Sequence, residues 1–493
     1  MCAATDKTVP DLAFNVERRK FERLLIVLFV LTLPFINPWV RGDGVGYYAY
    51  ARAPLISHNL DFTYDYQSAN QSFRDLRCEP DGTPKEQFRT VTRHLDNHFT
   101  VGPALLWSPL LIVAHGGVLV ARALGSHVAA DGYSAPYRFA MAFGTCLYGF
   151  WGLLISYRLA SKYIDPLWSF LATLAIWGAS SLPIYMYFNP AWSHAHSAFI
   201  CALFLWYWDR TRPQRSLAQW LVMGVIVGLM LDVYYPNLMI VSVLAVEALE
   251  QYADRLRARP VELQKMAQLL QRHLLCGLVV ILVMTPTFVS RWIVYGGPFR
   301  TGYLSLRDFL WTSPVFVSIL FSSNHGLLSW TPLIVFAIVG LLLFAFRTLE
   351  PGVTFCVAFT AFYIFMSFYP DWAGISSYGN RFFTSVTALF ILGLGFALQR
   401  FSEFFARRRT PLVLASAVLL CFTIWNLGMM YQWGTHLIPA RGPISFPEAA
   451  TNQFTVVPRQ LTSQLRSYFF RRSDLMRQIE ERDLEQMKKN AEP

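Results

Sequence analysis

A single aspartate, Asp43, follows the first long apolar run of the chain, within the segment 42–48 (GDGVGYY). The flanking glycines let the backbone turn and let a ligand come close to it. A carboxylate that is partly shielded from water at a membrane edge suits a general base. The alternative is a solvated aspartate in the turn that ends the first helix. The pattern makes Asp43 a candidate catalytic base.

An arginine, Arg381, stands at the start of a later apolar run, directly after the polar segment 369–380 (YPDWAGISSYGN). The planar guanidinium fork makes two parallel hydrogen bonds to phosphate oxygens. The alternative is an arginine that only reaches from a helix end to the membrane interface, which requires no such loop. The glycines and aromatic residues before Arg381 favour a phosphate site.

Two histidines, His194 and His196, belong to the segment 189–196 (NPAWSHAH). A His-x-His pair can ligate a divalent metal. On a helix, however, residues two positions apart point to different faces. We therefore expect one histidine to face a pocket and the other to cap a helix, with metal binding as the open alternative.

Several further polar side chains share one property, which is that each lies at the outer end of an apolar run. They are His94, Asp96, Asn97, His98, Asn189, Asp232, Asn237, Asn324, His325, Asp371 and Asn380. Almost no ionisable residue lies at the centre of a run, where charges mark the ion pathways of transporters. Helices that bring their outer ends together would form one pocket at the outer membrane surface.

The elements that must position these residues are long apolar segments. A polar segment, 1–23, precedes a first run at 24–40, which we expect to be an uncleaved helix with its N-terminus in the cytoplasm. Ten further runs lie at 136–158, 167–187, 195–208, 217–232, 237–250, 274–293, 328–346, 352–369, 382–398 and 411–430. The prediction is an all-α polytopic membrane protein with about eleven transmembrane helices.

The segment 99–124 is apolar enough to span a membrane, but Pro103, Pro109 and the pair at 116–117 (GG) interrupt it. If this segment does not cross, the basic clusters from Arg158 to Arg409 lie in the cytoplasm, as the positive-inside rule favours. We therefore expect a broken, partly re-entrant element here.

This topology gives the chain a long first outer loop, 41–135, which carries amphipathic helices. The polar tail, 431–493, is then extracytoplasmic, whereas a hidden crossing near 309–321 would place it inside. The tail shows no pattern of a further enzymatic domain.

The composition excludes several classes of protein. Hydrophobic residues make up 54% of the 493 residues and charged residues only 15%, whereas a soluble domain carries about 25% charged residues. This excludes a disordered chain, a disulfide mini-protein and an ordinary cytosolic enzyme. The net charge of +11 is typical of cytoplasmic loops, and no zinc, RNA-binding or Walker pattern points to nucleic acid.

Four segments together resemble bacterial membrane glycosyltransferases of the GT-C fold, which include relatives of protein O-mannosyltransferases and of the aminoarabinose transferase that acts on lipid A. The segments are 42–48, 97–109, 320–332 and 372–383, and the resemblance extends over most of 22–430. Many relatives carry Asp-Glu at the first motif, whereas here Gly44 follows Asp43. This departure speaks against a metal-assisted role at that position.

The resemblance implies a catalytic domain at 24–430 that moves a sugar from a polyprenyl-phosphate carrier to an acceptor hydroxyl, with inversion at the anomeric carbon. It places the reaction at the outer face of a bacterial cytoplasmic membrane, with a cell-envelope glycan, lipid or protein as acceptor and no certain cofactor. Asp43 would accept the hydroxyl proton and Arg381 would hold the leaving phosphate. The assisting and substrate-binding residues would be Asn380, His325, Tyr47, His98, His194, His196 and Asp371.

Two other functions compete with this one. A lipid or polysaccharide transporter would show internal repeats and discontinuous helices near the membrane midplane, and the sequence shows neither clearly. A non-catalytic membrane scaffold would use the outer polar residues only to bind a partner.

Overall fold

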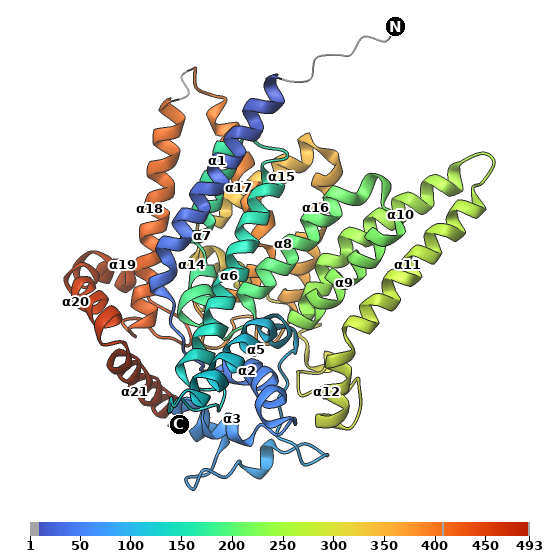
Figure 1. Ribbon diagram of the computed structural model, residues 1–493. Helices are drawn as coiled ribbons and strands as arrows, with labels where there is room; N and C mark the ends of the chain where they lie inside the picture. The colour runs from blue at the N-terminus through green and yellow to red at the C-terminus, as the bar shows by residue number, and fades with distance from the viewer. Residues whose placement is uncertain (1–8, 407–408, 492–493) are drawn as a thin grey trace.

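The computed structural model describes residues 9–406 and 409–491, which form a bundle of long helices with a loop-rich layer at one end (Figure 1). In this part of the chain, β pairing is limited to two isolated bridges, Cys78 with Pro84 and Arg89 with Leu95. The predicted all-α class is therefore confirmed. The long helices are α1 (Val9–Thr32), α6 (Ala135–Ala160), α7 (Pro166–Gly178), α8 (His194–Thr211), α9 (Leu217–Val233), α10 (Ser242–Arg257), α11 (Leu263–Val283), α15 (Ile334–Arg347), α16 (Leu349–Ser367), α17 (Thr387–Ser402) and α18 (Arg409–Gly434).

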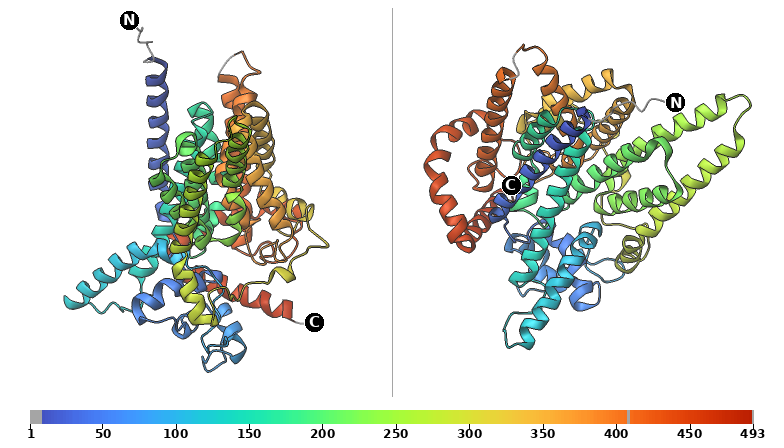
Figure 2. Two further views of the ribbon diagram at one scale, coloured as in Figure 1. Left: turned by 90° about the vertical axis from the view of Figure 1, so that its right-hand side faces the viewer. Right: turned by 45° about the horizontal axis from the view of Figure 1, so that its top comes forward.

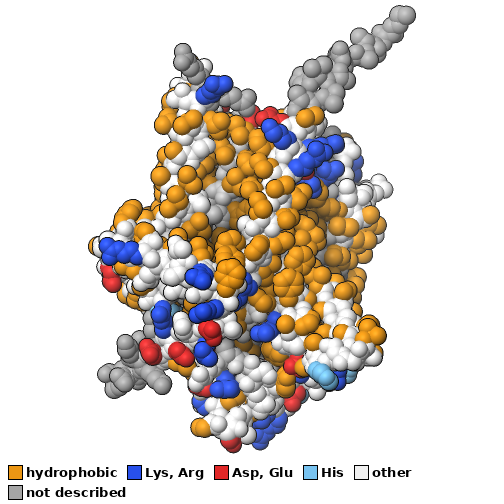
Figure 3. Space-filling model, turned by 60° about the vertical axis from the view of Figure 1, so that its left-hand side comes forward, with side chains coloured by type: hydrophobic (Ala, Val, Ile, Leu, Met, Phe, Trp, Pro, Cys, Tyr) orange, Lys and Arg blue, Asp and Glu red, His pale blue; other side chains and the backbone are white. Residues whose placement is uncertain are grey.

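Six helical segments of the described residues are long and apolar enough to cross a membrane: Gly102–Ala123, Ala135–Ala160, Leu263–Val283, Leu349–Ser367, Arg381–Ser402 and Arg409–Gly434. The helices α7, α9 and α15 are apolar but shorter. Hydrophobic side chains cover the flank of the bundle, and charged side chains gather towards its two ends (Figure 3). These features fit a multi-pass membrane protein, whereas the number of about eleven crossings stays a prediction.

The basic loops that the sequence places in the cytoplasm lie together at the end of the bundle where α1 begins. Three ion pairs connect these loops: Arg158 with Glu22 (2.9 Å), Lys162 with Asp209 (2.6 Å), and Arg212 with Glu350. The last helix of the chain, α21, lies at the opposite end (Figure 1).

The helix that leads out of the candidate site, α17, is packed in the centre of the bundle against α15. A Cβ atom at Gly340 would lie only 1.9 Å from the carbonyl oxygen of Gly393, so the two backbones touch directly. Small residues allow this close approach between membrane helices. The position of α17 is therefore tightly fixed.

The outer loop differs in two ways from the expected layout. The first helix, α1, ends at Thr32, and a 3-10 turn at Leu33–Phe35 is followed by non-helical residues 36–42. Proline at the start of that turn accounts for the early end of the helix.

The second difference is that α5 (Gly102–Ala123) is one continuous helix and is not broken at Pro109. The hydroxyl of Tyr148 donates to the carbonyl of Leu106 (2.9 Å), three residues before the proline. The N–H that Pro109 lacks would have bonded the carbonyl of Leu105, so the Tyr148 hydroxyl bonds the adjacent carbonyl and ties this turn of α5 to α6. In the left view of Figure 2, α5 (cyan) leaves the bundle sideways at the loop end.

Within the polar segment 431–493, the described residues 431–491 are built into the fold. After α18 the chain forms α19 (Phe446–Thr455), α20 (Val457–Phe470) and α21 (Arg472–Ala491). Gln432 donates to Gln453 (3.0 Å), and the hydroxyl of Tyr468 donates to the carbonyl of Phe35 (2.6 Å). These contacts fix the last three helices against α18 and the end of α1.

Candidate active site

Asp43 opens a second helix, α2 (Asp43–Arg52), and does not belong to the end of the first one. The preceding Gly42 has φ +53°, a left-handed conformation that favours glycine. The carboxylate lies in the first turn of α2, where the helix dipole stabilises negative charge. The backbone of Gly46 lies close to the ring of Phe99, and Asn97 donates to the Gly46 carbonyl (2.9 Å). The segments 42–48 and 97–109 are therefore in contact.

Arg381 forms an ion pair with Asp43, with 2.9 Å between Nη1 and Oδ2. The arginine side chain is 11% exposed and the aspartate side chain 34% exposed. The guanidinium carbon lies 4.4 Å from the centre of the Trp192 ring, a cation–π distance. A side chain that only reached for the interface would be solvated, so the snorkelling alternative does not describe Arg381.

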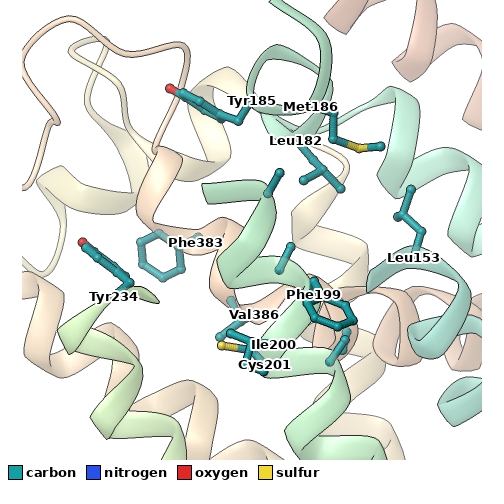
Figure 4. Close-up of a cluster of buried hydrophobic side chains, with 14 of the residues drawn as sticks. Leu153, Leu182, Tyr185, Met186, Phe199, Ile200, Cys201, Tyr234, Phe383 and Val386 are labelled. Atoms are coloured by element: carbon teal, nitrogen blue, oxygen red, sulfur yellow. The ribbon is translucent and has the colours of Figure 1, made fainter. Parts of the chain in front are cut away.

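The chain after Arg381 anchors it in the core. A 3-10 helix, η8 (Arg381–Val386), leads into α17. Phe383 and Val386 are fully or almost fully buried and belong to an apolar cluster with Phe199 and Ile200 (Figure 4). The guanidinium Nε makes no hydrogen bond within the described residues. Arg381 is thus held firmly and keeps a donor that a phosphate could use.

The ion pair lines a cavity of about 500 Å³ at the loop end of the bundle. Side chains from distant parts of the chain line it: Asp43, Tyr47, Arg77, His98, Phe99, Trp192, His194, Tyr234, Tyr303, Tyr369, Asp371, Arg381, Phe382 and Arg441. The cavity has the size of a small-molecule site and mixes aromatic with charged groups. Six of the predicted residues therefore share one cavity: Asp43, Tyr47, His98, His194, Asp371 and Arg381.

The phenol of Tyr47 is a neutral group in this cavity. It accepts a hydrogen bond from the Ser193 hydroxyl (3.0 Å), and burial raises the pKa of Tyr47 to about 12. The phenol therefore keeps its proton at neutral pH and can donate it to a substrate oxygen.

His98 and its neighbour Asp96 form a separate pair at the edge of the cavity. Burial alone would raise the pKa of Asp96, but hydrogen bonds from His98 and Tyr295 lower it below the usual value. A carboxylate held in this way is a weaker base, and Asp96 does not line the cavity, so it is a poor candidate for the general base.

His194 lies on the cavity wall among aromatic rings. The rings of Tyr185 and Tyr234 have their centres 4.7 and 6.1 Å from its own, and the Phe382 ring lies 6.3 Å away. The side chain is almost fully buried, which fixes the orientation of the imidazole. As expected for a helical i, i+2 pair, His196 points elsewhere, between Trp107 and Tyr148.

Two more predicted residues lie behind the cavity wall. His325 is fully buried and stacks on Trp330, with 4.7 Å between the ring centres. Asn380 is buried and donates to the carbonyl of Trp372 (3.1 Å). His325 supports the segment before Arg381 through Trp330, whose ring also contacts Tyr378 (5.4 Å). Asn380 supports the same segment through its bond to Trp372.

The cavity also contains residues that the sequence did not single out as functional, namely Trp192, Tyr303, Arg77 and Arg441. Trp192 lies in the segment that contains Asn189 and His194, which the sequence marks as polar and functional. The sequence does not indicate that the Trp192 ring packs under Arg381. Arg77 ends the helix α4 (Gln71–Arg77) and Arg441 lies in the loop after α18, and neither segment has a recognisable pattern. Only the folded chain brings them to the cavity.

The described residues hold no group of three or more His, Cys, Asp or Glu side chains that could bind a metal ion. Asp43 is paired with a guanidinium and not with a second carboxylate. The donor set around Asp43 therefore does not fit a carboxylate-bound divalent metal.

The chain matches no protein-family model, and no curated protein sequence matches it significantly. Among solved structures it is similar to ArnT from Cupriavidus metallidurans in the apo state, with 12% identity, a TM-score of 0.44, and 87% of this chain and 74% of that chain covered. It is also similar to the apo oligosaccharyltransferase of Archaeoglobus fulgidus, with 14% identity, a TM-score of 0.43, and 89% of this chain covered. This chain spans about half of the latter protein, 54% of its length.

Both solved structures are GT-C fold glycosyltransferases, the family that the four sequence segments resemble. At TM-scores of 0.44 and 0.43, no residue role passes from them to this chain, and the roles of its residues rest on the geometry of its own cavity.

Proposed function

We propose that this protein is a membrane glycosyltransferase that moves a sugar from a polyprenyl-phosphate carrier to an acceptor hydroxyl, with inversion. The observation that carries the proposal is the Asp43–Arg381 ion pair on the wall of a cavity of about 500 Å³. This pair combines a base with an anion-binding fork, and a displacement that expels a phosphate requires both. The basic loops at the opposite end favour a cavity on the outer side of the membrane.

Because Asp43 and Arg381 are paired, binding of the donor phosphate should change the state of Asp43. On binding, the phosphate competes with Asp43 for the guanidinium of Arg381 and receives its parallel hydrogen bonds. The carboxylate of Asp43 is then released from its cation and free to accept a proton. Donor binding thus prepares the base, so that the acceptor is activated only when the donor is present.

The chemical step forms one bond and breaks one at the anomeric carbon, and it moves one proton. The acceptor oxygen attacks the anomeric carbon from the face opposite the phosphate, and Asp43 takes the proton of the acceptor hydroxyl. The bond between the anomeric carbon and the phosphate oxygen breaks, and the phosphate leaves with the electron pair. Arg381 stabilises the charge that grows on this phosphate.

The carrier's lipid tail has a path to this site along the flank of the bundle. An apolar groove of about 760 Å³ between α1, α7, α18 and α20 continues into an apolar chamber of about 240 Å³, and Phe35, Tyr431 and Leu465 line both. A polar chamber of about 100 Å³ follows, and it shares Gly42 and Trp192 with the site cavity. An apolar tail in the groove would thus place its phosphate near Arg381.

Transfer by the purified protein tests this proposal. In lipid nanodiscs, the full-length protein should release polyprenyl phosphate from a polyprenyl-phosphate sugar only when an acceptor is present. A strain that lacks the protein should accumulate one such carrier lipid. Uptake of an intact lipid-linked sugar into vesicles, without release of the phosphate, would instead identify a transporter, and binding without either activity would identify a scaffold.

A further inference from the structure

The last helix of the chain, α21, is bound to the loop that carries Asp43. The carboxylate of Glu480 accepts hydrogen bonds from the backbone N–H of Ser72 (2.6 Å) and from the side chain of Asn70 (3.0 Å). Asp483, three residues later, pairs with Arg41 and lies 2.8 Å from the ring nitrogen Nε2 of His436. Two carboxylates on one face of α21 therefore contact the outer loop.

These contacts lead directly to the residue next to the candidate base. The side-chain oxygen of Asn70 accepts from the backbone N–H of Gly42 (3.1 Å). The carbonyl of Arg41 accepts from the indole of Trp192 (3.1 Å), and Trp192 is the platform under Arg381. Both residues before Asp43 are thus connected to α21, Arg41 by its ion pair and Gly42 through Asn70.

The turn at Asp43 has little rigidity of its own. Residues 36–42 are not helical, Gly42 is left-handed, and no side chain caps the N-terminus of α2. The carboxylate of Asp43 is 34% exposed and borders an open cavity. External contacts must therefore set its position relative to Arg381, which is held in the core.

We propose that Glu480 and Asp483 are positioning residues, with α21 acting as a brace that holds the turn at Arg41–Gly42 and thereby aims the Asp43 carboxylate into the cavity. This inference rests on the proposed function for its kinetic consequence only. The charges that face Asp483 are Arg41, His436 and Arg441. Burial would raise the pKa of Asp483, but the neighbouring Arg41 and the hydrogen bond with His436 lower it below the usual value, which favours the ionised carboxylate.

The test compares full-length variants of α21 in the transfer assay. Asp483→Asn and Glu480→Gln should lower kcat by about 10-fold or more, because misplacing a reacting group by about 1 Å costs up to about 100-fold. The KM for the donor should change less than kcat, because η8 and α17 hold Arg381 in the core independently of α21. Asp483→Glu should recover most of kcat. Glu481→Gln, on the exposed side of the same helix, is the matched control and should behave as wild type.

A variant outside α21 keeps the inference testable if the helix variants unfold. Asn70→Ala removes the connection between Glu480 and Gly42 without changing α21, and it should lower kcat in the same way. Unchanged kcat in Asn70→Ala, or in both helix variants, would overturn the brace. A fall in kcat that the Glu481→Gln control shares would also overturn it.

Amide hydrogen exchange separates this inference from the proposed function. Exchange at residues 42–46 should become faster in Asp483→Asn than in wild type, whatever reaction the protein catalyses. Faster exchange in a protein that transfers no sugar would leave the brace standing and reject the glycosyltransferase. Unchanged exchange would reject the brace alone.

Discussion

At the scale of single residues, Asp43 and Arg381 form an ion pair on the cavity wall. In the proposed reaction Asp43 acts on the acceptor and Arg381 on the donor, so variants of the two residues should have different effects. Asp43→Asn keeps the shape of the side chain but removes the base. Transfer should fall by about 10²–10⁴-fold, the usual contribution of a general base, while the melting temperature in detergent stays near that of wild type. Near-normal turnover in this variant would move the base to Asp371, the other carboxylate on the cavity wall.

Arg381 should depend on its shape as well as on its charge. Arg381→Lys keeps the cation but loses the fork and the flat contact with Trp192. Each lost charge-assisted hydrogen bond is worth about 1.5–3 kcal/mol, so kcat/KM for the donor should fall roughly 10- to 150-fold. The same exchange at Arg158, at the far end of the bundle, is the control. Wild-type kinetics in Arg381→Lys would reject the phosphate role.

At the scale of elements, the groove between α1, α18 and α20 should select donors by the length of their lipid. Leu465→Trp narrows the groove where it joins the inner chamber. Displacing two CH₂ groups costs about 1.6 kcal/mol, so the KM for a long-chain donor should rise about 10-fold or more. The KM for a donor with a two-isoprene lipid should stay unchanged.

Phe470→Trp, at a strongly exposed position of the same helix, is the control for this experiment. An equal effect of Leu465→Trp on short and long donors would show that the tail binds elsewhere.

The elements also show how far the sequence could lead. Apolar runs predicted the helices, because a membrane helix satisfies its backbone within one segment. The continuity of α5 could not be predicted, since the contacts that hold the turn before Pro109, such as the bond from Tyr148 to the carbonyl of Leu106, come from another helix. The packing of the polar segment 431–493 was equally hidden, because its contacts reach residues 35–72, far away in the sequence.

In the site, too, the residues at helix ends could be predicted from the sequence, whereas the contacts between distant segments could not. Asp43 and Arg381 were recognisable because a charged residue beside glycines at a helix end is unusual in an apolar chain. His196 and His325 are imidazoles like His194, but they pack against aromatic rings away from the cavity. The sequence does not show which histidine faces the cavity, because the surrounding rings come from other segments. Trp192 contributes its ring face to Arg381 and its indole N–H to the carbonyl of Arg41, and no sequence pattern marks either contact.

At the scale of the whole molecule, the two ends of the bundle should lie on opposite sides of the membrane. Reporter fusions after residues 165, 212 and 258 should indicate the cytoplasm, because their basic loops share one end. Fusions after residues 70, 130 and 376 should indicate the outside, since residues 70 and 376 line the polar chamber. An outside signal at 212 would contradict the orientation of the cavity.

The contact between α21 and the Asp43 turn also sets an order of events during biosynthesis. Asp43 and Asp483 lie far apart in the sequence, so the turn is synthesised long before the helix that braces it. Until then the chain has both reactive groups but no fixed geometry between them. A partly synthesised chain would therefore stay inert towards the lipids around it, and activity would begin only when α21 has been made and has docked.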